Sequence, residues 1–294
     1  MPEYTFEKAD KDLFAVYQTI YSQADVEMWF SWEARLNDTK DCGDCYFLCQ
    51  NGEKRGGAVI SGGTVMYAFL VPPFDDHRLF WQLVIEKAKS LTKKAEIACN
   101  GVLESEVEVL ESMGVRKWRP RQIMCRPTDV LPYTLPAGFT LEIPTLADIS
   151  EMARVAYTVN LGTISEEMFG SESLRDVKKE IKKSFAYFTE TGAMDQCSVI
   201  RGSDENKIVG GCVAGIYPKM PHGFAFIADV FVLPEVRGQG LAAAMLKHAI
   251  TMAHPKTPLM KLHVLVDNPA VNLYHRLGFV PGPVFTDMKY SVKG

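Results

Sequence analysis

The sequence has 294 residues, of which 47% are apolar and 23% charged. This ordinary globular composition excludes a disordered or collagen-like chain, and the length fits two domains or one large one at about 150 residues per domain. The 36 Asp and Glu residues outnumber the 32 Lys and Arg residues. The resulting net charge of −4 argues against broad, nonspecific binding to nucleic acid or anionic membranes.

Leader and cysteine patterns predict a cytoplasmic protein. The start of the chain lacks a basic segment followed by an apolar one, and no uncharged apolar run reaches the length of about 18 residues that a membrane helix needs. Seven scattered cysteines, an odd number, do not form a paired disulfide framework, so a reducing compartment is expected. Cys42 and Cys45 have the spacing of a zinc or redox pair, but no second pair accompanies them and we expect no metal.

The first half of the chain alternates between short β-rich and helical patterns. Trp29, Phe30 and Trp32 are expected on the core face of a helix between 25 and 36, with an aromatic acceptor patch as the alternative. Further along, the spacing of apolar residues and the positions of turn residues predict strands at 45–50, 54–61 and 64–71, a helix at about 75–91, a strand at 95–99 and a helix at 102–113.

A proline-rich segment follows at 127–138. Prolines remove amide donors and bias the preceding residues away from helix, so this segment is predicted to be a linker. The expected organisation is a domain at 1–130, a linker at 131–138 and a second domain at 139–294.

The second half repeats the order of the first. The patterns predict helices at 148–159 and 171–189, strands at 196–201, 207–216 and 224–233, a helix after Pro234, a strand at 259–266 and a short helix at 269–277. Gly56-Gly57 in the first half is echoed by Gly210-Gly211 in the second. The predicted fold class is therefore α+β, with one mixed α/β unit used twice.

The most informative segment runs from Val230 to Leu246, where a strand leads through a glycine-containing turn into a helix. Glycines allow backbone amides to converge, and a helix N-terminus adds partial positive charge, so this turn is suited to a pyrophosphate. The segment also fits the dinucleotide pattern Gly238-x-Gly240-x-x-Ala243, with Asp267 after the next strand. Four residues separate the strand from the first glycine, and the preceding strands form a meander, which together disfavour that alternative.

A second motif follows at 268–279, with the order Asn-Pro-Ala-x-x-Leu-Tyr-x-x-Leu-Gly-Phe. Together with the turn at 237–242, this motif resembles the GNAT superfamily of acyl-CoA N-acyltransferases over about 139–294. The resemblance implies a largely antiparallel, splayed central sheet flanked by helices, present as two tandem GNAT-type domains. It also implies acetyl-CoA as the cosubstrate.

The resemblance assigns roles to particular residues. Tyr274 is expected to protonate the departing thiolate, and Asp229 is the first candidate for the base, with His222, Glu166 and Glu167 as alternatives. The residues expected to bind the cosubstrate are Phe231, Val232, Leu233, Arg237, Gly238, Gln239, Gly240, Leu241, Ala242 and Asn268. Structural alternatives stay open for three residues: Tyr274 as core packing, Asp229 as an ordinary strand residue and Asn268 as a helix cap.

The first half departs from the family pattern at the phosphate turn. Asp75 and Asp76 stand where the second half has its glycines, and the tyrosine of the second motif is missing. We therefore expect a degenerate copy that does not bind CoA.

The predicted function is N-acetyltransfer from acetyl-CoA to a small-molecule or peptide amine by direct attack in a ternary complex. A CoA-sensing or regulatory module without turnover is the first alternative, and a dinucleotide-dependent enzyme is the second. No nucleic-acid or membrane partner is expected, and the sequence does not predict an oligomeric state.

Overall fold

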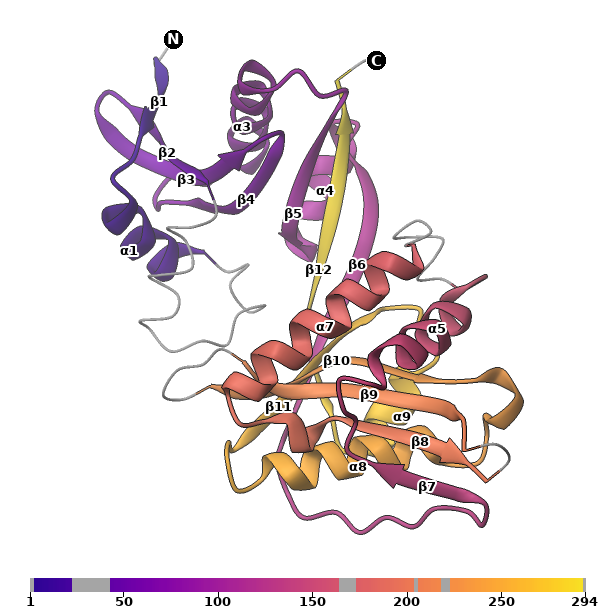
Figure 1. The fold of residues 1–294 in the computed structure, drawn as a ribbon. Helices are drawn as coiled ribbons and strands as arrows, with labels where there is room; N and C mark the ends of the chain where they lie inside the picture. Colours follow the sequence, from indigo (N-terminus) through magenta and orange to yellow (C-terminus); the bar gives the residue numbers. More distant parts are fainter. Residues whose placement is uncertain (1–2, 23–42, 164–172, 204–205, 218–222, 293–294) are drawn as a thin grey trace. The chain divides into compact units, whose positions relative to one another are not determined.

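The computed structural model describes residues 3–22, 43–163, 173–203, 206–217 and 223–292. The chain forms two compact units, shown in Figure 1. The first unit contains Met1–Gln122 and Pro283–Gly294, and the second contains Ile123–Gly282. Each unit combines helices with a mostly antiparallel sheet, which confirms the predicted α+β fold class.

The first unit is a sheet covered by helices. Strands β1 to β4 pair antiparallel in chain order, β4 pairs parallel with β5, and β12 pairs antiparallel with β5. Its elements are β1 (Tyr4–Lys8), α1 (Lys11–Tyr21), β2 (Asp44–Gln50), β3 (Glu53–Ser61), β4 (Thr64–Leu70), α3 (His77–Leu91), β5 (Glu96–Leu103) and α4 (Glu104–Ser112), with parts of β6 (Arg116–Pro127) and β12 (Val280–Ser291).

The second unit repeats this plan with the strand order β7-β8-β9-β10-β11-β6. One sheet face packs on α8 and the other on α5 and α7, so the sheet has an apolar core on each side. The remaining elements are β7 (Phe139–Glu142), α5 (Ile149–Asn160), α7 (Leu174–Glu190), β8 (Ser198–Gly202), β9 (Ile208–Tyr217), β10 (Phe224–Val232), α8 (Leu241–Ala253), β11 (Leu259–Leu265) and α9 (Val271–Arg276).

Local sequence explains where these elements begin. Helix α7 begins after Ser173, whose hydroxyl accepts a hydrogen bond from the Asp176 N–H at 3.2 Å, the cap bond that serine favours at a helix start. Strands β8, β9 and β10 form the predicted antiparallel meander, with apolar side chains alternating between the two cores.

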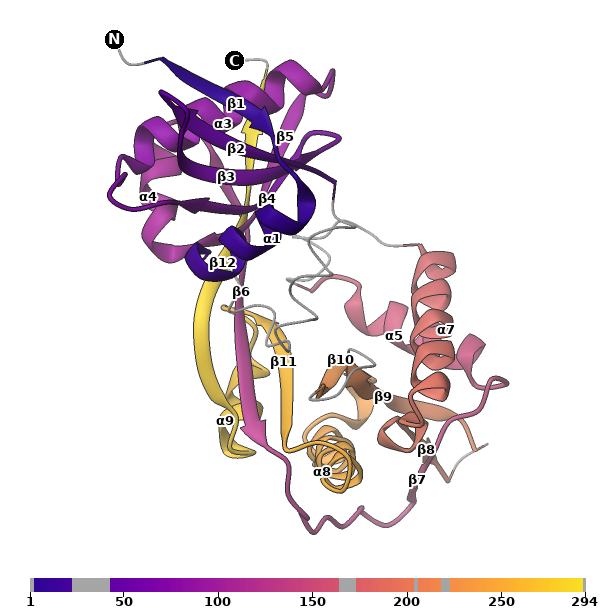
Figure 2. The same cartoon turned by 90° about the vertical axis from the view of Figure 1, so that its left-hand side faces the viewer.

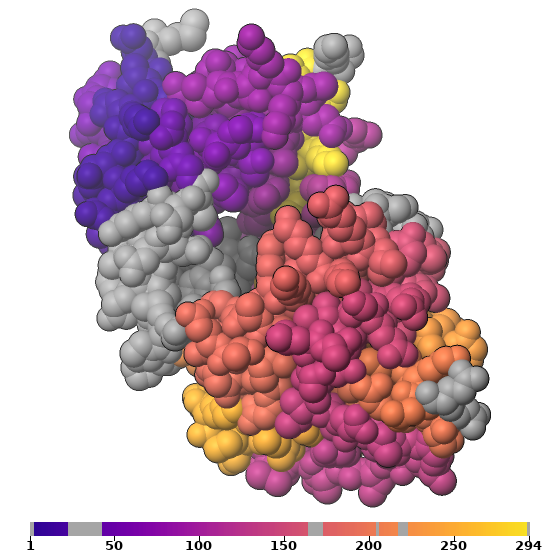
Figure 3. Space-filling model, viewed as in Figure 1, coloured from indigo at the N-terminus to yellow at the C-terminus, as the bar shows by residue number. Residues whose placement is uncertain are grey.

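The units are bounded differently from the predicted domains. Strands β6 and β12 are neighbours in the sheet and appear side by side in Figures 1 and 2, and each contributes residues to both units. Phe285 and Met288 of β12 are fully buried, and they pair with Leu103 and Cys99 of β5. The C-terminal residues accordingly lie among those of the first unit in the space-filling view (Figure 3). Long-range strand pairing, which local sequence does not reveal, moves these boundaries.

The proline-rich segment belongs to the second unit and packs along α8. The Leu131 N–H donates to the Thr251 hydroxyl at 3.0 Å, and Lys247 donates to the Pro132 carbonyl at 3.1 Å. Side chains of α8 thus satisfy backbone groups that a proline-rich segment cannot pair with itself.

Candidate active site

The candidate site begins where β10 and β11 stop pairing. Their parallel register runs from Ala225↔Met260 to Ile227↔Leu262 and then ends, although both strands continue. The register of β10 with β9 shifts between Ile227 and Asp229, which marks a β-bulge. After the bulge, β10 follows β9 alone and its other edge is available to a ligand.

The backbone of Val232 faces that other edge. The Leu233 N–H donates to the Val209 carbonyl on the β9 side at 2.8 Å. Because successive residues of an antiparallel strand direct their N–H and C=O groups alternately to opposite sides, the N–H and C=O of Val232 point away from β9. The Arg237 Nε donates to the Val232 carbonyl at 3.0 Å, which agrees with this direction.

The side chains of this strand end serve packing. Phe231 is 3% exposed and lies in the core beneath α5 and α7, whereas Val232 lies in the core beneath α8. Leu233 packs at the edge of the first of these cores. Phe231 and Val232 therefore have only backbone groups to offer a ligand, whereas the Leu233 side chain is half-buried.

The glycine turn leads into α8. Gly238 and Gly240 have φ angles of +78° and +81°, in the left-handed region that favours glycine, and an added Cβ would meet nothing within 4 Å at either position. The left-handed backbone, rather than crowding, is what calls for glycine here. Gly240 caps α8 without any side-chain hydrogen bond, so the first N–H groups of the helix keep their capacity to bind an anion.

The other predicted residues of the turn divide between solvent and core. Gln239 is exposed, Leu241 is buried at 2% exposure and Ala242 packs at the edge of the core. Leu241 therefore anchors the turn, while the exposed backbone of 238–240 faces solvent.

Tyr274 lies on α9 and is buried, with 7% exposure. Its ring packs edge-on against Phe279 at a centroid distance of 5.9 Å. Burial raises the pKa of the Tyr274 hydroxyl well above its ordinary value, and Cys212 and Asp229 add to this increase. The structure thus brings Tyr274 and Asp229 into electrostatic range, and it keeps the phenol protonated at neutral pH.

Cys212 is a residue of this cluster that sequence reasoning missed. It is fully buried on β9, and burial, Cys197 and Asp229 raise the pKa of its thiol well above 9.0. Burial likewise raises the pKa of Cys197 to about 12, and its Sγ donates to the Ala214 carbonyl at 3.1 Å. The only sequence signal was a cysteine directly after Gly210-Gly211, on the strand predicted at 207–216.

Asn268 has a local structural role. Its Oδ1 accepts a hydrogen bond from the Ala270 N–H at 2.9 Å, and its carbonyl accepts one from Val271 at 3.0 Å. The side chain thereby shapes the turn into α9, as the helix-cap alternative expects.

Several residues singled out in the sequence lie outside the described residues. They are the alternative bases His222, Glu166 and Glu167, the aromatic residues Trp29, Phe30 and Trp32, and Cys42.

The turn of the first unit that corresponds to the glycine turn is built differently. Asp76 caps α3, and its Oδ1 accepts a hydrogen bond from the Leu79 N–H at 2.9 Å. A carboxylate of the chain itself therefore occupies the helix end that Gly240 leaves uncovered in α8.

Two features are absent from the part of the chain that the structure describes. It contains no group of three or more His, Cys, Asp or Glu side chains placed to hold a metal ion. None of its helices combines the length and apolar character needed to span a membrane.

Known proteins resemble this chain in sequence and in structure. Residues 163–279 match the Acetyltransferase (GNAT) family. No significantly similar sequence was found among curated proteins. A GCN5-related N-acetyltransferase from Sphaerobacter thermophilus superposes with a TM-score of 0.70 and 17% identity, covering 99% of this chain and 96% of that one.

Two further solved structures superpose along almost the whole chain. A tandem GNAT protein from the clavulanic acid biosynthesis pathway gives a TM-score of 0.62 at 14% identity, covering 99% of each chain. A GNAT-family acetyltransferase from Colwellia psychrerythraea gives 0.59 at 12% identity, covering 98% of this chain and 100% of that one. These findings confirm the resemblance: the chain carries a domain of the GNAT acetyltransferase family at residues 163–279, within a GNAT fold shared with a tandem GNAT protein.

Proposed function

We propose that this protein is an N-acetyltransferase that moves an acetyl group from acetyl-CoA to an amine. The family match supports an acyltransferase in general. The observation that carries the finer proposal is the unpaired edge of β10 leading into the glycine turn. The outward N–H of Val232 offers one hydrogen bond to the acyl donor, and the first turn of α8 offers N–H groups to phosphates.

The chemistry follows from the residue types in the cluster. The amine nitrogen attacks the thioester carbonyl, forming a C–N bond, and the backbone N–H of Val232 stabilises the tetrahedral oxyanion. The C–S bond then breaks, and the CoA thiolate takes the proton of the Tyr274 hydroxyl. Asp229 accepts the proton lost by the amine, directly or through water. The Tyr274 hydroxyl is protonated at neutral pH, so a proton is available when the thiolate departs, while the raised pKa makes the phenol a weaker acid than a free tyrosine.

Direct attack fits better than a covalent acetyl-enzyme intermediate. A cysteine acts as a nucleophile in its thiolate form, and the raised pKa values of Cys197 and Cys212 keep both thiols protonated. We therefore propose a ternary complex in which amine and acetyl-CoA are bound together.

The fold disfavours the dinucleotide alternative. Strand β10 runs antiparallel to β9, whereas a dinucleotide-binding unit has a parallel sheet with the glycine turn directly after its first strand. Here the short helix Pro234–Val236 separates β10 from Gly238. Asp267 is exposed.

The proposed acceptor is a small-molecule or peptide amine. The proposed compartment is the cytoplasm. All six cysteines in the described part of the chain are free thiols, which suits a reducing compartment.

Ligand-dependent thermal unfolding tests the proposal. A ligand at 100 times its dissociation constant stabilises a protein by about 2.7 kcal/mol, so acetyl-CoA should raise the unfolding temperature measurably while NAD should not. Asp229→Asn should keep this stabilisation and lose turnover, because the amide cannot accept the proton. Stabilisation by NAD alone would reject the assignment.

A further inference from the structure

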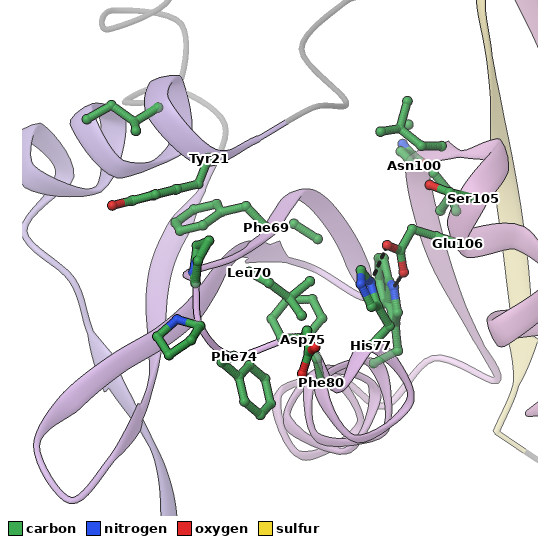
Figure 4. Close-up of a pocket in the computed structure, with 18 residues that line it drawn as sticks. Tyr21, Phe69, Leu70, Phe74, Asp75, His77, Phe80, Asn100, Ser105 and Glu106 are labelled. Carbon is green, nitrogen blue, oxygen red and sulfur yellow. Dashed lines mark hydrogen bonds and ion pairs between the residues drawn. The ribbon is translucent and has the colours of Figure 1, made fainter.

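We propose that the first unit has its own ligand site, which binds an amine with an apolar body and is distinct from the acetyl-CoA site. A cavity of about 650 Å³ lies in this unit, within the size range of small-molecule sites, and Figure 4 shows the side chains around it. The inference is independent of the proposed acetyltransfer.

The cavity lies where β4 and β5 stop pairing. Their parallel register consists of Thr64↔Ala98 and Val65↔Cys99, after which both strands continue unpaired with each other. The Val71 N–H donates to the Arg55 carbonyl on the β3 side at 2.8 Å, which matches the bond made by Leu233 in the second unit. The first unit thus keeps the opened strands of the fold.

Its anion site, however, is already filled. The Asp76 carboxylate accepts the hydrogen bond from Leu79 at the start of α3, and Asp75 beside it adds a second carboxylate. Two carboxylates repel phosphate, so acetyl-CoA is a poor ligand for this cavity.

The lining favours a ligand that is both cationic and apolar. Tyr21 and Phe69 lie one above the other, with ring centroids 6.5 Å apart, and Phe74 and Trp81 also line the cavity. Aromatic faces attract ammonium groups and pack against apolar bodies. Among the described lining residues, the carboxylate of Asp75 adds negative charge and neither lysine nor arginine opposes it.

The polar groups of the cavity also favour an amine ligand. The Oδ1 of Asn100 is buried and has no hydrogen-bond partner among the described residues. Glu106 is already engaged, since its Oε1 lies 2.5 Å from His77 Nδ1 and its Oε2 accepts from Trp81 Nε1 at 2.9 Å. What the cavity lacks is therefore a hydrogen-bond donor for Asn100, and an ammonium group supplies donors without needing an acceptor in return.

The test is calorimetric titration of the full chain with matched ligand pairs. Each pair consists of an amine and the alcohol of the same skeleton: 2-phenylethylamine with 2-phenylethanol, and hexylamine with hexanol. At least one amine should bind at least about tenfold more tightly than its alcohol, because the ammonium group carries a positive charge and more hydrogen-bond donors than the single O–H of the alcohol. If no amine is preferred over its alcohol, the proposal is wrong.

Variants locate the binding in the first unit. Asp75→Asn and Asn100→Leu should each weaken amine binding at least about fivefold. Glu86→Gln, which removes a charge from the exposed face of the same helix as His77, should not change it. Asp75 is exposed, so its variant remains informative even if Asn100→Leu misfolds. Unchanged amine affinity in Asp75→Asn, or displacement of the amine by acetyl-CoA, would overturn the proposal. Acetyl-CoA affinity should stay the same in all three variants.

Discussion

Arg237 donates a hydrogen bond from Nε to the carbonyl oxygen of Val232 at 3.0 Å. This bond ties the middle of the segment between β10 and α8 to the strand end, because Val232 ends β10 and Arg237 directly precedes the first glycine of the turn. It also leaves the N–H of Val232 as the group that this peptide edge can offer to a ligand. The arginine thus positions the turn in addition to bringing positive charge to it.

Replacing Arg237 should separate these two contributions. Arg237→Lys keeps the charge but loses the Nε donor, so CoA affinity should fall about two- to tenfold, the value of one net hydrogen bond. Arg237→Met should weaken binding further. Titration calorimetry with CoA measures both variants, and Glu235→Gln on the same turn serves as the control. Full affinity in Arg237→Lys would show that the bond to Val232 does not matter.

Gly240→Ala should reduce both stability and CoA affinity. A side chain at φ +81° costs about 1–2 kcal/mol, and relief of that strain turns the backbone amides away from their shared direction. Gly192→Ala is a matched control, because Gly192 also has positive φ and open space around its Cβ but follows α7. Denaturant unfolding should show similar losses for both variants, while calorimetry should show weakened CoA binding only for Gly240→Ala. Equal CoA affinity in the two variants would contradict the assigned role of the turn.

Local patterns predicted most elements because each carries its own periodicity and cap. The strand predicted at 54–61 is β3, Glu53–Ser61, and the helix predicted at 171–189 is α7, Leu174–Glu190. Strands β1 and β6 were not predicted, and β12 was predicted only as extended chain from Phe279 onward, without its partners. Their partners lie far away in the sequence, as Phe285 opposite Leu103 illustrates, and pairing of that kind leaves no local signal.

The part of the site that could be predicted from the sequence is the glycine turn, because glycine is the residue that readily adopts positive φ angles. The positive φ angles at Gly238 and Gly240 were implied by residue type, whereas the proximity of Cys212 to Tyr274 depends on how α9 packs against the sheet. The pocket of the first unit was not predicted at all. It is defined by the ends of strands and helices whose side chains converge only after folding.

Tyr274→Phe should lower turnover at least tenfold while CoA affinity barely changes, since general acids contribute about 10²–10⁴-fold and the phenyl ring preserves packing. Steady-state kinetics combined with CoA titration measures the two effects separately. An unchanged rate would remove Tyr274 from the acid role and leave core packing as its explanation.

The same variant should alter stability at alkaline pH. The pKa of Tyr274 is raised in the folded protein above the ordinary value of 10.0, so its contribution to stability is complete below pH 10.0 and is lost as pH rises through the folded pKa. Between about pH 9 and about pH 11, the unfolding temperature of the wild type should fall more than that of Tyr274→Phe. All other ionisable groups are shared by the two proteins, so the difference between their curves reports Tyr274 together with its coupling to Cys212 and Asp229. Parallel curves for the two proteins would refute the raised pKa.

Asp76→Ala should destabilise the protein without affecting CoA. Loss of an N-cap costs about 1 kcal/mol, and Asp10→Ala, which removes an equivalent cap bond of 2.9 Å to Leu13 on α1, should cost a similar amount. CoA should bind both variants with the wild-type affinity at a single site. A second CoA site in Asp76→Ala would show that only this carboxylate keeps CoA out of the first unit.

Acetyl transfer itself is the central claim, and release of the CoA thiol across a panel of amines tests it most directly. With an accepted amine, thiol release should equal the amount of N-acetylated amine found by mass spectrometry. Without amine, neither thiol nor acetylated protein should accumulate. Tight acetyl-CoA binding without turnover on any amine would instead indicate a CoA-sensing protein, and an acetylated protein formed in the absence of amine would contradict direct attack.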